Sequence, residues 1–286
     1  NGPLVMGPVW DFDRTQGSQD GRDFNPRLWR STVSDRGTDF FNADPIFNNP
    51  WYSLLFTDLE FWQKWIDRYQ DLRRSVLSNT NLAAIIDGFA DQVRAAQPRE
   101  VSRWGVGPRN GTVSSAGFSY NFPGTYQGEV DFMKRWYSNR CDFIDTNFVR
   151  PHVFVVAAGR VPAGTRVPIT GDPAGRIYYT LDGSDPRLAG GGIAPKALLY
   201  QGTVPITNAV RLVARCYDPA HRNLTGPDNP PLNSTWSGPL AATYYPDVPA
   251  LILTEIMYHP PPPPAGDTNA AENFAYLALK NAGDTT

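Results

Sequence analysis

Cysteine and histidine are both scarce in this chain of 286 residues, which has two Cys and three His. Cys141 and Cys216 cannot form a disulfide framework or a multi-cysteine zinc site, and we expect both to be buried thiols. His152, His221 and His259 do not have the spacing of metal ligands. The Gly-x-Ser-x-Gly and His-Glu-x-x-His motifs are also missing, so triad hydrolases and zinc proteases have no support.

The chain has little net charge and no long apolar segment. Its 26 basic and 28 acidic residues leave a formal net charge of −2, so it has no general attraction to nucleic acid or anionic lipid. A membrane span needs roughly 18 consecutive apolar residues, and no such run is present. The sequence starts at Asn1 and has no signal peptide, so we expect it to be a piece of a longer protein.

Proline divides the chain near residue 150. Only 8 of the 27 prolines lie in residues 1–150, which also hold most of the charged residues. A charged, proline-poor region is typical of helices, whereas a proline-rich region with little charge is typical of short strands and loops. At roughly 100–200 residues per domain, we predict two domains and the start of a third, over 1–150, 151–246 and 250–286.

Apolar periodicity predicts three helices in the first region. They cover 54–77, 82–93 after a cap at Ser78 or Thr80, and 130–144. Their apolar residues recur every three or four positions, as they do on one face of an α-helix. We expect these faces to form a packed helical core and not a cofactor-binding surface, so the first region is predicted to be mainly helical.

After residue 150 the patterns indicate strands. Apolar alternation or continuous apolar runs occur at 153–156, 167–170, 177–180 and 210–215. The dipeptide Asp182-Gly183 favours a turn, because glycine accepts positive φ. Short strands at this spacing predict an antiparallel β-sandwich of about 100 residues. Two further strands, at 252–257 and 276–279, flank the stiff run of prolines from 260 to 264.

The motif with the clearest chemistry is Gly7-Pro8-Val9-Trp10-Asp11-Phe12-Asp13-Arg14, with Gly17 three residues later. Asp11 and Asp13 beside a turn could hold a divalent cation and the phosphate oxygens bound to it. The spacing alone favours a surface turn instead, because a chain rich in Asp contains such pairs by chance.

The wider context of this motif resembles the C-terminal lobe of the CotH-type kinase family, atypical kinases first associated with spore-coat assembly. The resemblance covers residues 1–150 and includes Phe132-Met133-Lys134-Arg135-Trp136 and Arg140-Cys141-Asp142-Phe143-Ile144-Asp145, which are similar to the family's closing helix. It implies a phosphotransferase dependent on ATP and Mg²⁺ and a protein phosphoacceptor. It gives the metal-binding role to Asp11 first and Asp13 second, and the sequence does not decide between them.

The family's nucleotide-binding lobe, with its phosphate-contacting Lys and catalytic Asp, lies upstream of this motif and does not occur in residues 1–286. Phosphoryl transfer depends almost wholly on positioning and charge stabilisation, so a metal carboxylate without the phosphate-binding residues supplies little. No Gly-x-x-x-x-Gly-Lys loop is present either. We therefore assign no catalytic residue and expect no kinase activity from this sequence alone.

Residues 151–246 resemble the chitobiase C-terminal, fibronectin-III-associated β-sandwich. The resemblance rests on Gly175-Arg-Ile-Tyr-Tyr-Thr-Leu-Asp-Gly-Ser-Asp-Pro186, on the strands at 197–200 and 210–215, and on Trp236-Ser237. It implies a bacterial extracellular or cell-surface module that accompanies glycan-active enzymes and has no catalytic machinery. Tyr179 or Trp236 could stack on sugars, but we expect Trp236 in the core. Residues 182–186 are predicted to be a turn in preference to a cation site.

Residues 250–286 resemble the start of a lamin-tail domain, an immunoglobulin-like sandwich, on Leu251-Ile-Leu-Thr-Glu-Ile-Met-Tyr-His-Pro260 and 274–284. Only about a third of such a sandwich is present, so we expect this segment to be poorly ordered or sticky. The predicted fold class is therefore α+β and multidomain: a mainly helical kinase C-lobe fragment, an antiparallel β-sandwich and a truncated immunoglobulin-like domain.

Two functions remain open at this point. In the first, a CotH-like kinase carries β-sandwiches that attach it to a surface or matrix. In the second, the kinase-like region is a relic, and the chain is a non-catalytic extracellular scaffold or glycan-associated module. The motif at Asp11 favours the first for the parent protein, whereas binding or scaffolding is the safer expectation for this stretch alone.

Overall fold

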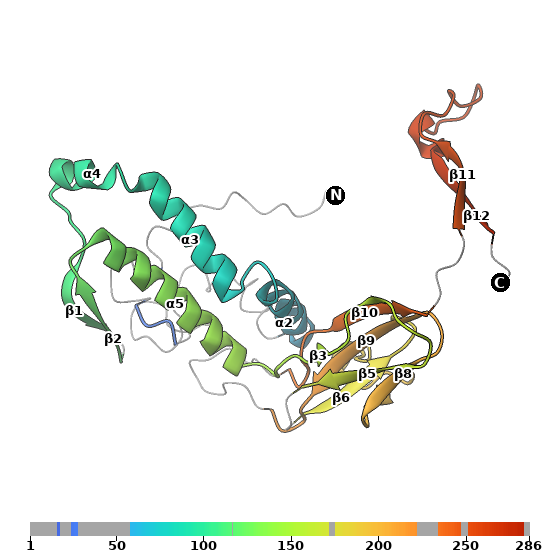
Figure 1. Ribbon diagram of the computed structural model, residues 1–286, viewed down its shortest axis with the longest axis horizontal. Coiled ribbons are helices and arrows are strands. Elements are labelled where there is room, and N and C mark those ends of the chain that lie inside the picture. The colour runs from blue at the N-terminus through green and yellow to red at the C-terminus, as the bar shows by residue number, and fades with distance from the viewer. Residues whose placement is uncertain are drawn as a thin grey trace.

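The computed structural model describes residues 16–17, 24–27, 58–115, 117–171, 175–221, 234–246 and 251–282. Figure 1 shows a helical region with one hairpin, then a pair of packed sheets, then a second hairpin. The helices are α2 (Leu59–Arg73), α3 (Asn79–Val93), α4 (Gln97–Trp104) and α5 (Tyr126–Thr146). Strands β1 (Asn110–Ser115) and β2 (Phe118–Pro123) pair between α4 and α5. No helix in the described part of the chain is long and apolar enough to cross a membrane.

The three predicted helices are present, and each begins at a capping side chain. The Asp58 carboxylate accepts two backbone hydrogen bonds, at 2.7 and 3.0 Å, in the first turn of α2. Ser78 accepts one at 3.3 Å ahead of α3, so the cap is Ser78 and not Thr80. Thr125 does the same for α5. These caps pair N–H groups that have no partner inside a helix. The predicted start of the first helix, at 54–57, lies outside the described residues.

Sequence patterns do not predict α4 or the β1–β2 hairpin. Helix α4 has Pro98 in its first turn, where the missing N–H costs no helical hydrogen bond. Strand β1 alternates exposed and half-buried residues, β2 buries Phe118 and Phe122, and the hairpin turns at Gly117, whose φ is +79°. The chain is α+β, as predicted, but helices account for 31% of the described residues, so the description as mainly helical is not supported.

Three apolar clusters form the core of the first region. The faces predicted on α2 and α5 contribute to them, but the face predicted on α3 is not buried as expected, because Ile85, Phe89 and Val93 are 42%, 65% and 53% exposed. The first joins α2 to the end of α5 through Trp62, Ile66, Tyr69, Ile144 and Phe148. The second lies under the β1–β2 hairpin and consists of Phe24, Phe118, Phe122 and Phe132. The third, Ile86, Ala90 and Val130, joins α3 to α5. Helix α5 contributes to all three clusters and is the central element of this region.

The predicted β-sandwich is present after α5. Its larger sheet has the order β4-β10-β9-β6-β7, and its smaller sheet the order β3-β5-β8. The strands are β3 (Val153–Phe154), β4 (Gly159–Arg160), β5 (Thr165–Thr170), β6 (Arg176–Thr180), β7 (Leu198–Leu199), β8 (Thr203–Ile206), β9 (Val210–Tyr217) and β10 (Leu240–Tyr245). All pairs are antiparallel except β4 with β10. The core between the sheets includes five side chains that are fully buried: Val167, Val204, Leu212, Ala214 and Tyr244.

The last two strands, β11 (Leu251–Met257) and β12 (Tyr276–Asn281), form a hairpin of their own. Figure 1 shows it in red, apart from the sandwich. Both of its faces are open to solvent: Leu251, Ile252, Ile256, Leu277 and Leu279 are each more than half exposed. The segment therefore forms the two predicted strands but buries no core of its own in the described structure.

Candidate functional site

The residues expected to bind metal, Asp11 and Asp13, lie outside the described part of the chain. The nearest described residues are Gln16 and Gly17, which form a turn with φ values of +64° and +67°. A Cβ atom at Gly17 would lie 3.0 Å from the ring of Phe132 and 3.1 Å from that of Phe24. Both the left-handed backbone and the close aromatic rings therefore require glycine at this position.

Arg109 fixes this turn to α5. Its Nη1 donates a hydrogen bond of 2.6 Å to the Gly17 carbonyl, and its Nε and Nη2 donate to the Glu129 carboxylate at 3.1 and 2.6 Å. The guanidinium lies 3.9 Å from the centre of the Phe122 ring and 4.8 Å from that of Phe132. Paired charges and stacking of this kind hold a guanidinium in one orientation. The chain four residues after Asp13 is thus anchored to the aromatic cluster.

An apolar groove of about 990 Å³ runs between α3, α4 and α5 and reaches Gln16 at one end. Its floor is formed by the buried side chains Ile86, Ala90 and Val130. Its rim carries exposed apolar side chains, among them Phe89, Val93, Val106 and Met133. A mostly apolar concave surface is typical of binding sites, although the lining side chains specify no particular ligand.

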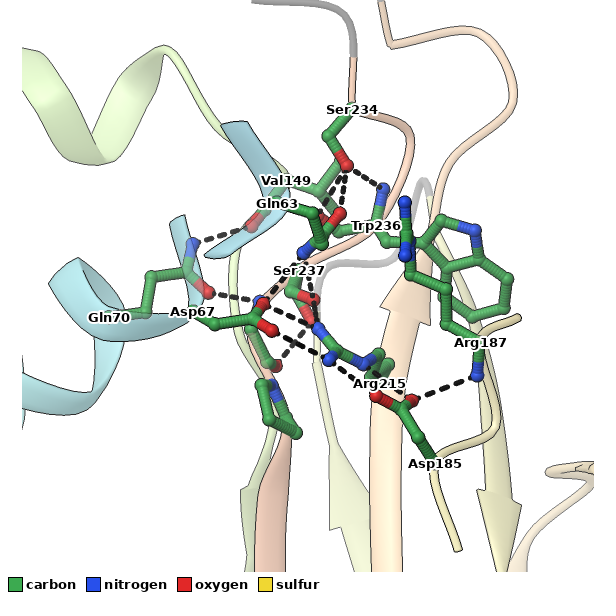
Figure 2. A network of polar contacts seen from close by, with 12 residues as sticks. Gln63, Asp67, Gln70, Val149, Asp185, Arg187, Arg215, Ser234, Trp236 and Ser237 are labelled. Atoms are coloured by element: carbon green, nitrogen blue, oxygen red, sulfur yellow. Dashed lines mark hydrogen bonds and ion pairs between the residues drawn. The ribbon is translucent and has the colours of Figure 1, made fainter. Parts of the chain in front are cut away.

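A second site of interest lies where α2 meets the sandwich (Figure 2). Arg215 of β9 is 3% exposed and lies between two carboxylates, Asp67 of α2 and Asp185 of the turn after β6. Its guanidinium donates to both oxygens of Asp67, at 2.6 and 2.8 Å, and to both oxygens of Asp185, at 2.7 and 2.6 Å. Despite burial, these hydrogen bonds raise the pKa of Arg215, so the charged form is maintained.

Two buried glutamines of α2 complete the same contact. Gln70 accepts from the Gly238 N–H at 2.7 Å and donates to the Val149 carbonyl at 3.0 Å. Gln63 accepts a hydrogen bond from the Ser234 hydroxyl. Amide side chains at 2% and 3% exposure are rare unless they are paired in this way. The face of α2 turned to the sandwich is therefore polar, buried and hydrogen-bonded.

A third ion pair closes one edge of this contact. Arg187 donates to both oxygens of Glu60 at 2.6 and 2.9 Å, and the Gly190 N–H donates to the same carboxylate at 2.8 Å. The hydrogen bond from Arg187, followed by that from Gly190, lowers the pKa of Glu60 to about 2. The pair therefore stays ionised through the whole moderately acidic range.

His152 lies buried beside this contact, in the segment that connects α5 to the sandwich. It is 1% exposed, and neither ring nitrogen has a hydrogen-bond partner among the described residues. Burial, together with the positive charges of Arg74 and Arg215, lowers its pKa to about 3. His152 is therefore neutral at physiological pH, and it would be unfavourable to protonate it in place.

The structure decides several of the other sequence-based expectations. Trp236 is in the core, as predicted, at 1% exposure, and its ring N–H donates to the Gly191 carbonyl at 2.7 Å. Cys141 and Cys216 are both buried free thiols, and burial raises the pKa of Cys141. Residues 182–186 form the expected turn, in which Asp182 accepts from the Ser184 N–H at 3.0 Å.

Neither side of the α2–sandwich contact is predicted from the sequence. Glu60, Gln63, Asp67, Gln70 and Arg74 recur every three or four positions, which normally indicates a solvated helix face. An available signal is that this polar face lies next to an equally regular apolar one, on a helix followed by a predicted sandwich. No group of three or more His, Cys, Asp or Glu side chains within the described residues is placed to hold a metal.

Comparison with protein-family models gives two matches. The model described as CotH kinase protein matches residues 1–144, and that of the chitobiase/beta-hexosaminidase C-terminal domain matches residues 156–225. The first covers half of the chain, so the chain belongs to the CotH kinase protein family. No curated protein and no solved structure matches it. The family match includes Asp11, Asp13, Arg109 and Glu129, and the second match includes Asp185 and Arg215.

Proposed function

We propose that this chain contributes the metal-binding lobe of a CotH-like atypical protein kinase that is secreted or attached to a surface, with β-sandwich modules fused to it. The observation that carries the proposal is the family match over residues 1–144, within which Trp10-Asp11-Phe12-Asp13 stands. The described geometry supports it, because Arg109 and the aromatic cluster around Gly17 hold the chain just after this motif. A fixed backbone is what a metal-binding carboxylate needs.

The donor set suits Mg²⁺. Asp11 and Asp13 offer carboxylate oxygens, the ligands that Mg²⁺ prefers, and one or both would hold the ion. Bound Mg²⁺ would neutralise charge on the phosphates of ATP. The carboxylates would bind the ion directly. The Gly17 turn, which Arg109 attaches to Glu129 of α5, would fix their position relative to that helix. Which of the two carries the role is open, with Asp11 preferred.

We further propose that residues 1–286 alone do not transfer phosphate. The sequence has no Gly-x-x-x-x-Gly-Lys loop and nothing that matches the family's phosphate-contacting Lys or catalytic Asp. Most of the catalytic effect in phosphoryl transfer comes from such positioned charges. We also propose that residues 250–286 begin a lamin-tail domain and that the phosphate acceptor of the whole kinase is a protein.

The experiment is a calorimetric titration of the chain with ATP, carried out with and without Mg²⁺. If Asp11 or Asp13 holds the ion, Mg²⁺-dependent binding occurs and falls at least about tenfold in Asp11→Ala or Asp13→Ala. Asp91→Ala is the matched control, because the Asp91 side chain on α3 is 69% exposed. Binding that survives both substitutions would refute the metal role. Phosphate transfer by residues 1–286, lost on Asp11→Ala, would refute the proposed inactivity.

A second candidate function is a non-catalytic, glycan-associated or scaffolding module. The match of residues 156–225 to the chitobiase/beta-hexosaminidase C-terminal domain favours it. Against sugar stacking, Trp236 is buried and Tyr179 is half-buried. Binding to insoluble chitin with no Mg²⁺-dependent binding of ATP would favour this second function over the first.

A further inference from the structure

Helix α2 is buried on two neighbouring faces, and the two faces meet different regions of the molecule. Its apolar face, with Trp62, Ile66 and Tyr69, packs against the end of α5. Its polar face, with Gln63 and Asp67, contacts the sandwich (Figure 2). A helix held on both sides cannot move relative to one neighbour without disturbing the other.

We infer that the chitobiase-type sandwich is a structural part of the kinase-like lobe and not a module on a flexible linker. In this arrangement the sandwich positions α2, and α2 and the sandwich unfold as one cooperative unit. Arg215 is the central positioning residue, since it joins Asp67 of α2 to Asp185 of the sandwich.

The first argument is the quality of the Arg215 contact. Four hydrogen bonds link its guanidinium to the two carboxylates, and Nη1 also donates to the Ser237 carbonyl at 2.7 Å. At 3% exposure the guanidinium depends on these partners for the solvation it has lost. Paired, planar contacts of this kind define one relative orientation of the two elements.

The second argument is close backbone approach. Gly238 has no side chain, and a Cβ atom there would lie 3.1 Å from Gln70 and 3.3 Å from the backbone of Asp67. Its N–H donates to Gln70 at 2.7 Å. Surfaces that meet at backbone distance, with no room for a methyl group, are packed as tightly as a domain core.

The third argument is the connection itself. Phe148 is 2% exposed and belongs to the α2–α5 cluster, whereas the next residue, Val149, is 4% exposed and belongs to the core of the sandwich. A flexible linker is exposed and polar, and its residues do not belong to two cores. The chain therefore passes from one core to the other without an intervening hinge.

The contact also continues into α5. The Tyr69 hydroxyl donates to Asp145 at 2.9 Å, and Arg73 Nε donates to the other oxygen of Asp145 at 3.0 Å. Helix α2 thus lies between the sandwich and α5, with ionic or hydrogen-bonded contacts on both sides. A loss of contact with the sandwich should therefore loosen α2 and the end of α5.

The test is amide hydrogen exchange measured by mass spectrometry on the whole chain. Asp185→Asn removes a charge on the sandwich side only. We expect it to speed exchange in peptides from α2 and the end of α5 on the order of tenfold, besides its effect on the sandwich. Asp67→Asn, on the helix side, should likewise speed exchange in β9 and in peptides that cover 234–238.

Asp182→Asn is the matched control. Asp182 lies in the same turn, three residues before Asp185, but its partner Lys196 is 78% exposed and neither contacts α2 in the described structure. We expect no change above about twofold in α2 for this variant. Suppose that Asp185→Asn speeds exchange in the sandwich but leaves the exchange rates of α2 and the end of α5 as they are in Asp182→Asn. The two regions would then unfold independently, and the inference would be wrong.

Gly238→Ala is the second variant, in case Asp185→Asn folds poorly. It leaves every charge in place but forces Gln70 and the Asp67 backbone to move. The same faster exchange on both sides of the contact would support one cooperative unit. Faster exchange confined to residues 234–246 would contradict it.

Discussion

Helices α2 and α3 have the same length, yet the structure treats their side chains in opposite ways. On α2 the polar residues Gln63 and Gln70 are buried at 2% and 3% exposure. On α3 the apolar residues Phe89 and Val93 are 65% and 53% exposed. Whether a side chain of these helices is buried therefore depends on which element packs against its face, and not on whether the side chain is polar or apolar. Helix α2 has the sandwich on its polar side, whereas the outer side of α3 lines the open groove.

The largest expected difference between the two helices comes from removing the guanidinium that pairs with an aspartate of each helix, Arg215 for Asp67 and Arg94 for Asp91. Arg215→Ala leaves Asp67 and Asp185 facing each other without their shared cation, which should cost about 3 kcal/mol of unfolding free energy. We choose the lower end of the usual range because the two carboxylates are 27% and 43% exposed. Urea unfolding followed by tryptophan fluorescence measures it.

Arg94→Ala, at the residue that directly follows α3, is the control for this experiment. Its pair with Asp91 is 51% and 69% exposed, so the loss should be less than about 1 kcal/mol. Equal losses for the two variants would mean that burial at the α2–sandwich contact has no energetic consequence.

A second prediction concerns pH. The folded-state pKa of His152 is about 3, below the ordinary value of 6.5 that it regains on unfolding. Its contribution to stability is therefore complete above pH 6.5 and is lost as the pH falls toward 3, by about 2 kcal/mol at pH 5. Glu60, with a pKa of about 2, adds a loss only below its ordinary value of 4.5. Thermal melts between pH 7 and pH 5 should show the decline due to His152.

His152→Leu tests this assignment. The variant has no imidazole to titrate, so its stability should change much less between pH 7 and pH 5, whatever its absolute stability. A decline as steep as that of the unsubstituted chain would assign the pH dependence to other groups.

The smallest expected changes in stability come from substituting one side chain on each helix, Gln70 on α2 and Phe89 on α3. Gln70→Ala leaves the Gly238 N–H and the Val149 carbonyl without their partner and should cost about 1–2 kcal/mol. Phe89→Ser removes a large apolar group that is already 65% exposed and should change stability by less than about 0.5 kcal/mol. Chemical denaturation of both variants measures the difference, and a larger loss for Phe89→Ser would show that the groove is covered in solution.

Much of the local structure could be predicted because it depends on neighbours in sequence. The 3.6-residue period identifies α2, α3 and α5, and Ser78, one of two predicted caps, begins α3. The cap of α2 at Asp58 was not predicted. Apolar patterns identify β3, β5, β6 and β9, whereas β4, β8 and β10 were not predicted. The usual burial of aromatic side chains predicts Trp236 in the core, where it lies. The β1–β2 hairpin was not predicted, because β1 has Val113 as its one apolar residue and buries none of its side chains, although β2 buries Phe118 and Phe122.

The candidate site could be predicted only in part. The motif at Asp11 and Asp13 was identified from the sequence, and its metal-binding role stays a prediction. Arg109 and Glu129, which anchor the following turn, lie 92 and 112 residues beyond Gly17, and no local pattern connects them to it. Short motifs report residues that are adjacent in the chain, whereas supporting contacts come from elsewhere in the fold.

The amino-acid sequence was enough to show that the chain has little net charge and too few cysteines and histidines for a disulfide framework or a multi-cysteine zinc site. It also contains the periods of the main helices and strands and the motifs of the two matched families. Only the tertiary structure decided that the polar face of α2 is buried and that the apolar face of α3 is open. The physical reason is that periodicity records which side chains share a face, whereas burial depends on what packs against it. For Asp67 that partner is Arg215, which lies 148 residues further along the chain.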